Sequence, residues 1–150
     1  MIKSRICDIL GIKYPIFQGG MAWVADASLA AAVSNAGGLG LISAINAGTE
    51  AVRNEIRKCK ELTDKPFGVN IMLQAPNAAE IAEMIVEEGV KIVTTGAGSP
   101  AKYLPMWKEN GIKVIPVIAC VAHAIKMQAA GVDAIVAEGA ESGGHVGELH

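Results

Sequence analysis

The residues with the clearest chemical potential lie in a glycine-rich segment near the end of the chain. Residues 138–147 read Glu-Gly-Ala-Glu-Ser-Gly-Gly-His-Val-Gly, and they directly follow the apolar run 134–137. Catalytic groups of α/β proteins lie where strands end, and loop glycines let the backbone approach a ligand closely. His145 is the foremost candidate, because an imidazole with an ordinary pKa of about 6.5 can exchange protons at neutral pH. The ordinary structural alternative is a solvated loop histidine.

The same loop carries further groups that could hold a ligand. Glu138 ends the apolar run, so its carboxylate is expected to point into the site and bond ligand hydroxyls. Gly143 and Gly144 offer backbone N–H groups. Glu141 is interpreted as an ordinary loop carboxylate, and His123, within a predicted helix, as structural.

A second candidate segment lies near the start of the chain. Residues 18–22 read Gln-Gly-Gly-Met-Ala and follow the first predicted strand. Gly20, Met21 and Ala22 could supply backbone hydrogen bonds and a flat apolar wall to a planar ligand. The alternative is an ordinary turn between a strand and a helix.

Two further candidates follow internal strands. Asn70 stands between apolar Val69 and Ile71, so its amide must find a partner if it is buried. That partner is either a ligand or the loop that the amide caps. Thr95 belongs to the small-residue segment 94–98, which leads into a helix start and could accept an anion there. An equally good interpretation is a short connector that lines a pocket.

One unit recurs along the chain: an apolar strand, a loop of small residues, an amphipathic helix and a glycine. Asn77 is the predicted N-cap of one helix, with Glu80 completing a variant capping box. Pro105 should kink or restart another helix. The predicted strands are 14–18, 39–43, 66–72, 91–95, 113–118 and 133–137, and the predicted helices are 27–36, 50–62, 78–88, 100–110 and 121–130.

The spacing of the strand ends predicts a parallel sheet. Taken at Asn70, Thr94, Val117 and Glu138, these ends lie 24, 23 and 21 residues apart. Such a regular strand-helix cadence indicates parallel strands joined by right-handed crossovers. Strands that are apolar on both sides, such as 114–118, are typical of sheets covered on both faces.

Two architectures share this cadence, a doubly wound open sheet and a (β/α)8 TIM barrel. The dinucleotide fingerprint of the first is missing, because Gly38 and Gly40 precede a strand and position 43 is Ser. The barrel is therefore favoured. Six units do not close eight strands, so residues 1–150 are expected to form the N-terminal portion of one barrel domain, whose C-terminal remainder would cover the open strand edges.

Composition excludes several classes of protein. Hydrophobic residues make up 51% of the chain and aromatic residues only 4%, which predicts an aliphatic core. A net charge of −2 argues against a nucleic-acid partner. No apolar run approaches the roughly 20 residues of a membrane span, and no signal peptide is recognised. Three widely spaced cysteines predict a reducing cytoplasm, without disulfides or a metal site.

Four segments carry a resemblance to a known family. Residues 14–26, 65–73, 93–98 and 138–147 resemble the flavin-dependent enoyl-acyl-carrier-protein reductase II family, and the similarity extends in register through all 150 residues. The wider superfamily includes nitronate monooxygenases, which share the Gly-Gly-His loop. The motif Gly-Gly-Met-Ala-Trp-Val-Ala-Asp is closer to that of the reductases.

The resemblance implies a barrel that binds FMN at its C-terminal mouth. NADH or NADPH would reduce FMN, and hydride would pass to an enoyl thioester on acyl carrier protein, with His145 at the thioester end. Whether a monovalent cation is also required stays open, and a homodimer is expected. The cofactor contacts that we predict are Gly20, Met21, Ala22, Asn70, Thr95, Glu138, Gly143 and Gly144.

Two alternatives to this function stay open at the level of sequence. The first is the oxidation of alkyl nitronates by flavin and O2, with His145 as the base. The second is an inactive structural half of a barrel, which would need its C-terminal complement before it could act.

Overall fold

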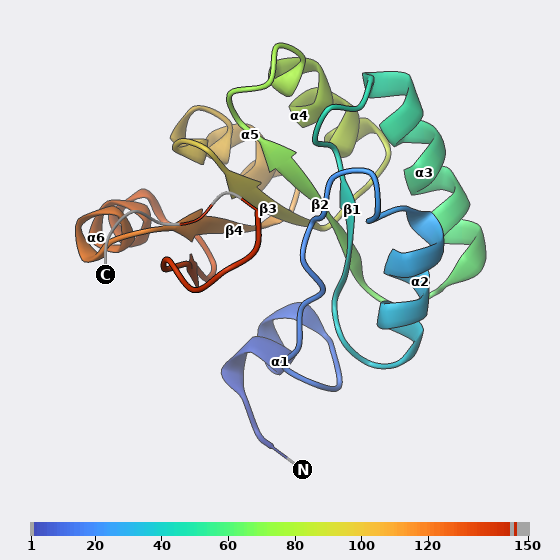
Figure 1. The fold of residues 1–150 in the computed structure, drawn as a ribbon, viewed down its shortest axis with the longest axis horizontal. Coiled ribbons are helices and arrows are strands. Elements are labelled where there is room, and N and C mark those ends of the chain that lie inside the picture. The colour runs from blue at the N-terminus through green and yellow to red at the C-terminus, as the bar shows by residue number, and fades with distance from the viewer. Residues whose placement is uncertain (1, 145, 147–150) are drawn as a thin grey trace.

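The computed structural model describes residues 2–144 and 146 (Figure 1). Its helices are α1 (Arg5–Leu10), α2 (Ala27–Asn35), α3 (Thr49–Leu62), α4 (Ala78–Glu87), α5 (Leu104–Glu109), α6 (Val121–Ala130) and the 3-10 helix η1 (Pro100–Lys102). Its strands are β1 (Gly40–Ser43), β2 (Phe67–Met72), β3 (Ile92–Gly96), β4 (Lys113–Ile118) and β5 (Val136–Ala137). All of these except α1 were predicted from the sequence, although β5 is confined to the last two residues of the predicted strand 133–137.

The five strands form one parallel sheet in the order β1-β2-β3-β4-β5. Each strand therefore pairs with the strand that precedes it along the chain. A doubly wound sheet would reverse its strand order at a switch point, and no reversal occurs among the described strands. The parallel α/β arrangement that the spacing predicts is confirmed.

The first predicted strand, 14–18, is shorter than expected. Only Phe17 forms a ladder bridge, parallel to Leu39. The N–H of Leu39 donates to the carbonyl of Ile16 at 2.9 Å, and the N–H of Gln18 donates to the carbonyl of Leu39 at 3.0 Å. The N–H of Ile16 donates to the carbonyl of Tyr14 at 2.8 Å and so leaves the ladder, while the N–H of Tyr14 donates to the carbonyl of Gly37 at 2.8 Å. The segment lies beside the residue that precedes β1.

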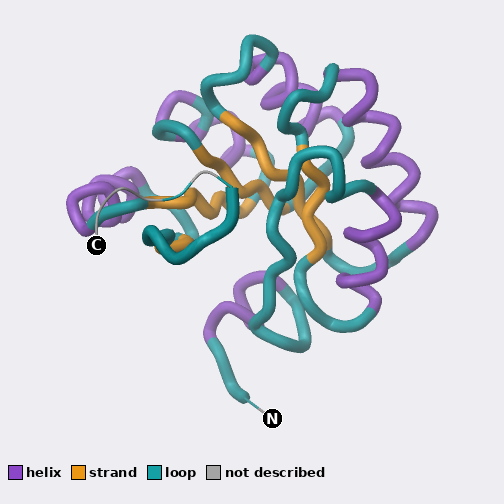
Figure 2. Tube along the Cα trace, in the orientation of Figure 1, coloured by secondary structure: helices purple, strands orange, loops and turns teal. Residues whose placement is uncertain are grey.

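Side chains of the sheet alternate between two apolar layers. Ile42, Val69 and Val93 face the surrounding helices and pack in a cluster with residues of α2, α3 and α4. Figure 2 shows these helices around the outside of the curved sheet. Leu41 and Ile115 face the inner side, where they join a second cluster. An aliphatic core built on both faces of the sheet agrees with the composition.

Helix α1 closes the inner layer at the end where the strands begin. The hydroxyl oxygen of Ser4 accepts from the N–H of Ile6, which caps the helix, and Gly11 ends it with a φ of 69°. Leu10 of this helix is 5% exposed and packs with Ile92 and Ile115. The helix therefore covers the inner core at the amino end of the sheet.

The predicted capping box at the start of α4 is wrong. The side chain of Asn77 makes no capping hydrogen bond. Its amide nitrogen instead donates to the carbonyl of Ala47 at 2.9 Å, and the carboxylate of Glu80 accepts from the hydroxyl of Thr49 at 3.0 Å. Tertiary partners at the start of α3 therefore take both side chains, and they tie the two neighbouring helices together.

The helical segment between β3 and β4 is divided, as Pro105 predicts. The 3-10 turn η1 ends at Lys102, and α5 starts afresh at Leu104, with the proline in its first turn. The hydroxyl oxygen of Ser99 accepts from the N–H of Ala101 at 3.3 Å and thereby caps η1. A proline in a first turn costs no helical hydrogen bond, which explains the restart.

A network of charged groups joins α3 to the end of α4. Arg53 contacts Glu88 at 2.6 Å and Glu87 at 3.0 Å, and Arg57 contacts Glu88 at 2.9 Å. The hydrogen bonds from Arg57 and Arg53 lower the pKa of the Glu88 carboxyl to about 2. Glu88 is therefore held in its charged form.

Within the described residues, no helix is both long enough and apolar enough to cross a membrane. Cys7, Cys59 and Cys120 are all free thiols, so the prediction that no disulfide joins them is confirmed. Cys59 is buried, and burial raises the pKa of its thiol to about 11. Its role is that of a small apolar core residue.

Candidate functional site

Two of the predicted segments meet at the carboxyl end of the sheet. Gly20 packs so closely against Asn70, in β2, that a Cβ at position 20 would lie 2.5 Å from the Asn70 Cβ and 2.7 Å from its amide nitrogen. No side chain fits in that space, which explains why the position carries glycine. The loop 18–22 and the end of β2, fifty residues apart in sequence, thus form one surface.

Gln18 fixes the loop at this edge. Its amide nitrogen donates to the carbonyl of Leu41 at 3.0 Å, and its amide oxygen accepts from the N–H of the same residue at 3.1 Å. The side chain thereby imitates a paired strand backbone and extends the sheet by one position. These two hydrogen bonds therefore anchor the loop just before Gly20 to Ala22.

The Asn70 amide is oriented by its neighbour in the next strand. Thr94 lies opposite Asn70 in the ladder, and its hydroxyl donates to the Asn70 amide oxygen at 2.7 Å. Thr94 is buried, so this hydrogen bond is shielded from solvent. The amide nitrogen donates to none of the other described residues, which leaves two N–H bonds for a ligand.

The side chain of Thr95, which we predicted as a cofactor contact, lies on the other face. Successive side chains of a strand alternate, so Thr95 follows Val93 toward the helices, and Thr94 shares the face of Asn70. The Thr95 hydroxyl is fully buried and has no hydrogen-bond partner among the described residues. Thr94, which the sequence analysis did not propose, is the threonine on the face of the candidate site.

The loop 19–22 presents unused backbone donors. The N–H of Met21 donates to the carbonyl of Gly19 at 3.0 Å, but those of Gly20 and Ala22 bond to none of the residues that the structure describes. The side chain of Met21 is 45% exposed and offers an apolar surface beside them. Free donors next to an apolar side chain suit the edge and face of a planar heterocycle.

Backbone strain collects in the loops that follow the strands. In the described part of the chain, three residues other than glycine have a positive φ: Trp23 at 67°, Asn46 at 56° and Ala97 at 57°. They follow the first bridge, β1 and β3, so all three belong to the carboxyl-end loops. Strained residues cluster at ligand sites, and this distribution singles out the same end of the sheet.

The glycine-rich loop begins at the same edge. The N–H of Glu138 donates to the carbonyl of Ile118 at 2.9 Å, which continues the β4–β5 pairing, and the Glu138 side chain is half-buried. Gly143 and Gly144 are exposed with open space around them, and Gly144 has a φ of 74°. His145 lies outside the described residues.

This donor set fits the flavin that the resemblance implies. The pyrimidine ring of a flavin presents carbonyl oxygens and a ring nitrogen as acceptors, and the Gly20 and Ala22 N–H groups and the Asn70 amide nitrogen are donors. The absence of a Cβ at Gly20 gives the ligand access to the backbone. These residues could hold such a ring through its polar edge.

Comparison with known proteins gives a consistent result. A family model described as nitronate monooxygenase matches residues 3–87 and 82–150. The structure of FabK from Thermotoga maritima has a TM-score of 0.97 to this chain and 49% sequence identity, covering 99% of this chain and 48% of that chain. This likeness identifies the sheet as part of a (β/α)8 TIM barrel, as predicted.

Two curated relatives support the same grouping. The (3aS,4S,5R,7aS)-5-hydroxy-7a-methyl-1-oxo-octahydro-1H-indene-4-carboxyl-CoA dehydrogenase of Mycobacterium tuberculosis is 38% identical, over 99% of this chain and 42% of its own length. The nitronate monooxygenase of Paraburkholderia phytofirmans is 33% identical, over 97% of this chain and 50% of its own length. The chain thus spans about half the length of the curated relatives it matches.

Proposed function

We propose that this chain, which belongs to the nitronate monooxygenase family, forms the FMN-binding part of an oxidoreductase that reduces the enoyl thioester of acyl carrier protein. NADH or NADPH would be the reductant. The likeness to FabK, an enoyl-acyl-carrier-protein reductase, supports this substrate over others in the family. The contact between Gly20 and Asn70 carries the proposal, because it builds a donor-lined surface at the carboxyl end of the sheet.

Each residue of the site would have a distinct part in this reaction. Bound FMN would supply the hydride that goes to the β-carbon of the enoyl thioester. The N–H groups of Gly20 and Ala22 and the Asn70 amide would orient the ring, and the Thr94 hydroxyl would hold that amide in position. Glu138 would accept hydrogen bonds from hydroxyls of the cofactor.

His145 is the candidate for contact with the thioester. A donor at the thioester carbonyl stabilises the negative charge that develops when hydride reaches the β-carbon, and the α-carbon then takes up a proton. An imidazolium could supply both the hydrogen bond and that proton. Gly143 and Gly144, which are exposed with open space around them, offer further backbone donors for the same oxygen.

The test is an assay of the complete enzyme with a crotonyl thioester and NADH or NADPH, following oxidation of the nicotinamide. We expect His145→Ala to lower turnover at least about tenfold, while the visible flavin absorbance stays unchanged. His123→Ala, on the exposed surface of α6, is the matched control and should keep full turnover. Unchanged turnover in His145→Ala would remove the imidazole from the mechanism.

Nitronate oxidation is the second candidate, because the matching family model and the Paraburkholderia relative both carry that description. His145 would then remove a proton as a base, and O2 would be the oxidant. The complete protein given an alkyl nitronate and O2, without nicotinamide, should consume oxygen only if this second function is correct. The two assays therefore separate the two candidates.

We also propose that the C-terminal half of the barrel packs against α6 and pairs with the free edge of β5. Val121 and Ile125 lie one helical turn apart on α6 and are 75% and 61% exposed. An apolar stripe of this kind normally faces a neighbouring element. Flavin absorbance should appear only when the chain is joined to that half, and a yellow chain on its own would contradict this requirement. A cytoplasmic homodimer is the assembly that we propose.

A further inference from the structure

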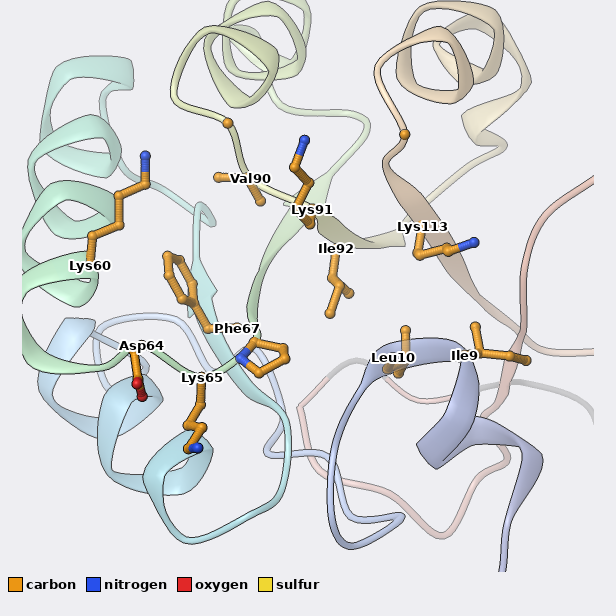
Figure 3. A pocket seen from close by; sticks show the side chains of 13 residues that line it. Ile9, Leu10, Lys60, Asp64, Lys65, Phe67, Val90, Lys91, Ile92 and Lys113 are labelled. Atoms are coloured by element: carbon orange, nitrogen blue, oxygen red, sulfur yellow. The ribbon is translucent and has the colours of Figure 1, made fainter.

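A cavity opens at the end of the sheet opposite the candidate site, where the strands begin. It lies between α1 and the loops that enter β2, β3 and β4, and its volume is about 410 Å³. Sites for small molecules commonly measure about 300 to 1,000 Å³, so the cavity is large enough for one. Figure 3 shows Lys60, Lys91 and Lys113 along one side, Ile9 and Leu10 of α1 along another, and Ile92 between them.

The floor of this cavity is apolar. Leu10 and Ile92 are 5% and 2% exposed and belong to the inner core cluster. Ile9, Phe67 and Val90 complete the apolar lining. Hydrocarbon placed against these side chains would lose contact with water, at about 25 cal/mol per Å² of buried apolar area. The floor therefore favours a ligand with a hydrocarbon part.

The rim of the cavity is cationic. Four lysines line it, at positions 60, 65, 91 and 113, against a single acidic residue, Asp64. The whole chain has a net charge of −2, so this concentration of positive charge is local. Opposite charges attract across such a rim, and the attraction weakens as salt is added. The rim therefore favours an anionic group.

Lys91 is the cation best placed to receive that group. The backbone of Lys113 donates to the carbonyl of Lys91 at 2.8 Å, so the two residues are neighbours on adjacent strands. The Lys113 ammonium lies 3.8 Å from Asp133, and the Lys60 ammonium donates to a backbone carbonyl of Glu88. The Lys91 and Lys65 ammonium groups form no ion pair with any described residue. Lys91 directly precedes Ile92 of the floor and stands at the rim, where its side chain is directed away from Ile92 (Figure 3).

We propose that this cavity binds an amphipathic anion, whose hydrocarbon chain lies on Ile92 and α1 and whose head group contacts Lys91. A small inorganic anion would leave the apolar floor exposed, and a neutral hydrocarbon would leave the lysines unused. A carboxylate and a phosphate monoester share the required chemistry. The site is at the amino end of the sheet, so the proposal does not depend on the function proposed for the carboxyl end.

Calorimetric titration of the complete protein with four compounds tests this proposal. Decanoate and decyl phosphate should bind, while decanol and inorganic phosphate should bind at least about tenfold more weakly. Whichever of decanoate and decyl phosphate binds more tightly identifies the head group that the cavity prefers. Lys91→Glu should weaken both at least about tenfold, and Lys91→Gln should weaken them less. Lys58→Glu, an exposed lysine of α3 that does not line the cavity, is the matched control and should bind like the parent.

Three results would overturn the proposal. Equal binding by the parent and Lys91→Glu would show that the lysine takes no part. Equal binding of decyl phosphate and inorganic phosphate would show that the apolar floor is not used. A loss of affinity in Lys58→Glu equal to that in Lys91→Glu would show that the anion is attracted only by the overall charge of the protein. Flavin absorbance and turnover are not readouts of this experiment, so its result is separate from that of the enzymatic assays.

Discussion

The two ends of the sheet differ in how their backbone and side chains are used. At the carboxyl end, the Gly20 and Ala22 N–H groups are unbonded among the described residues, and three non-glycine residues hold a strained backbone. At the amino end, α1 closes the inner core and Leu10 is buried. The same strands thus present unbonded backbone donors at the carboxyl end, where active sites of α/β barrels lie, and a helix-covered core beside the lysine-rimmed cavity at the amino end.

The largest expected effect concerns the amino end. Leu10→Ala should lower the free energy of unfolding by about 3 kcal/mol, because it removes a buried side chain and leaves a cavity in the inner core. Urea denaturation measures the change, and flavin affinity of the complete protein should stay the same. Ile2→Ala, at a position that is 76% exposed, should have little effect. A loss below about 1 kcal/mol in Leu10→Ala would mean that α1 is not part of the core.

The second prediction applies the opposite test to the carboxyl end. Gly20→Ala should weaken FMN binding by the complete protein about a hundredfold, since a new Cβ would push Asn70 and the loop apart. Gly19→Ala is the matched control, because its Cβ would meet only the Met21 side chain, at 4.0 Å. Flavin fluorescence titration gives both affinities. Similar values for the two variants would show that the contact between the loop and β2 does not shape the site.

The third prediction separates Asn70 from the residue that orients it. Asn70→Ala should weaken FMN binding about tenfold, because a ligand donor is lost. Thr94→Val keeps the shape of the threonine but removes the hydroxyl that bonds the amide oxygen, so it should weaken binding only a few-fold. The same titration applies. A larger loss in Thr94→Val than in Asn70→Ala would assign the primary contact to the threonine.

The smallest expected effect lies outside both ends, in the network between α3 and α4. The pKa of Glu88 is lowered from 4.5 to about 2, so its carboxylate stabilises the fold above about pH 4.5, and this contribution is lost as the pH falls toward 2. Glu88→Gln should cost about 1 kcal/mol at neutral pH and flatten that acid dependence of unfolding. Glu87→Gln, at a more exposed partner of Arg53, should change less. An unchanged acid profile in Glu88→Gln would contradict the assignment.

The sequence predicts the sheet well because its strands carry their own signals. Apolar runs such as 114–118 and the regular spacing of strand ends need no knowledge of tertiary contacts. Helix α1 was missed because its six residues are too few to show a helical period among interspersed charges. The capping box failed for a different reason, since Thr49 and Ala47, distant in sequence, take the side chains that it needed.

For the candidate site, strand ends were a sufficient guide to Asn70 and to the loop 18–22, because parallel strands bring their carboxyl ends to one edge. The sequence could not show in the same way which of Thr94 and Thr95 shares the face of Asn70. The answer depends on which face of β3 meets Asn70, and that follows from the ladder register. The lysine-rimmed cavity was also not predicted, because its residues come from separate loops.

The consecutive order of the strands bears on how the chain folds. Each pairing, from Gly40 with Phe67 to Val117 with Val136, joins residues about two dozen positions apart, so the entropy lost on closing each loop stays small. Low sequence separation between contacting residues favours rapid folding. As the chain leaves the ribosome, each new strand-helix unit can dock on the unit made just before it. In this sheet, the direction of synthesis is also the direction of assembly.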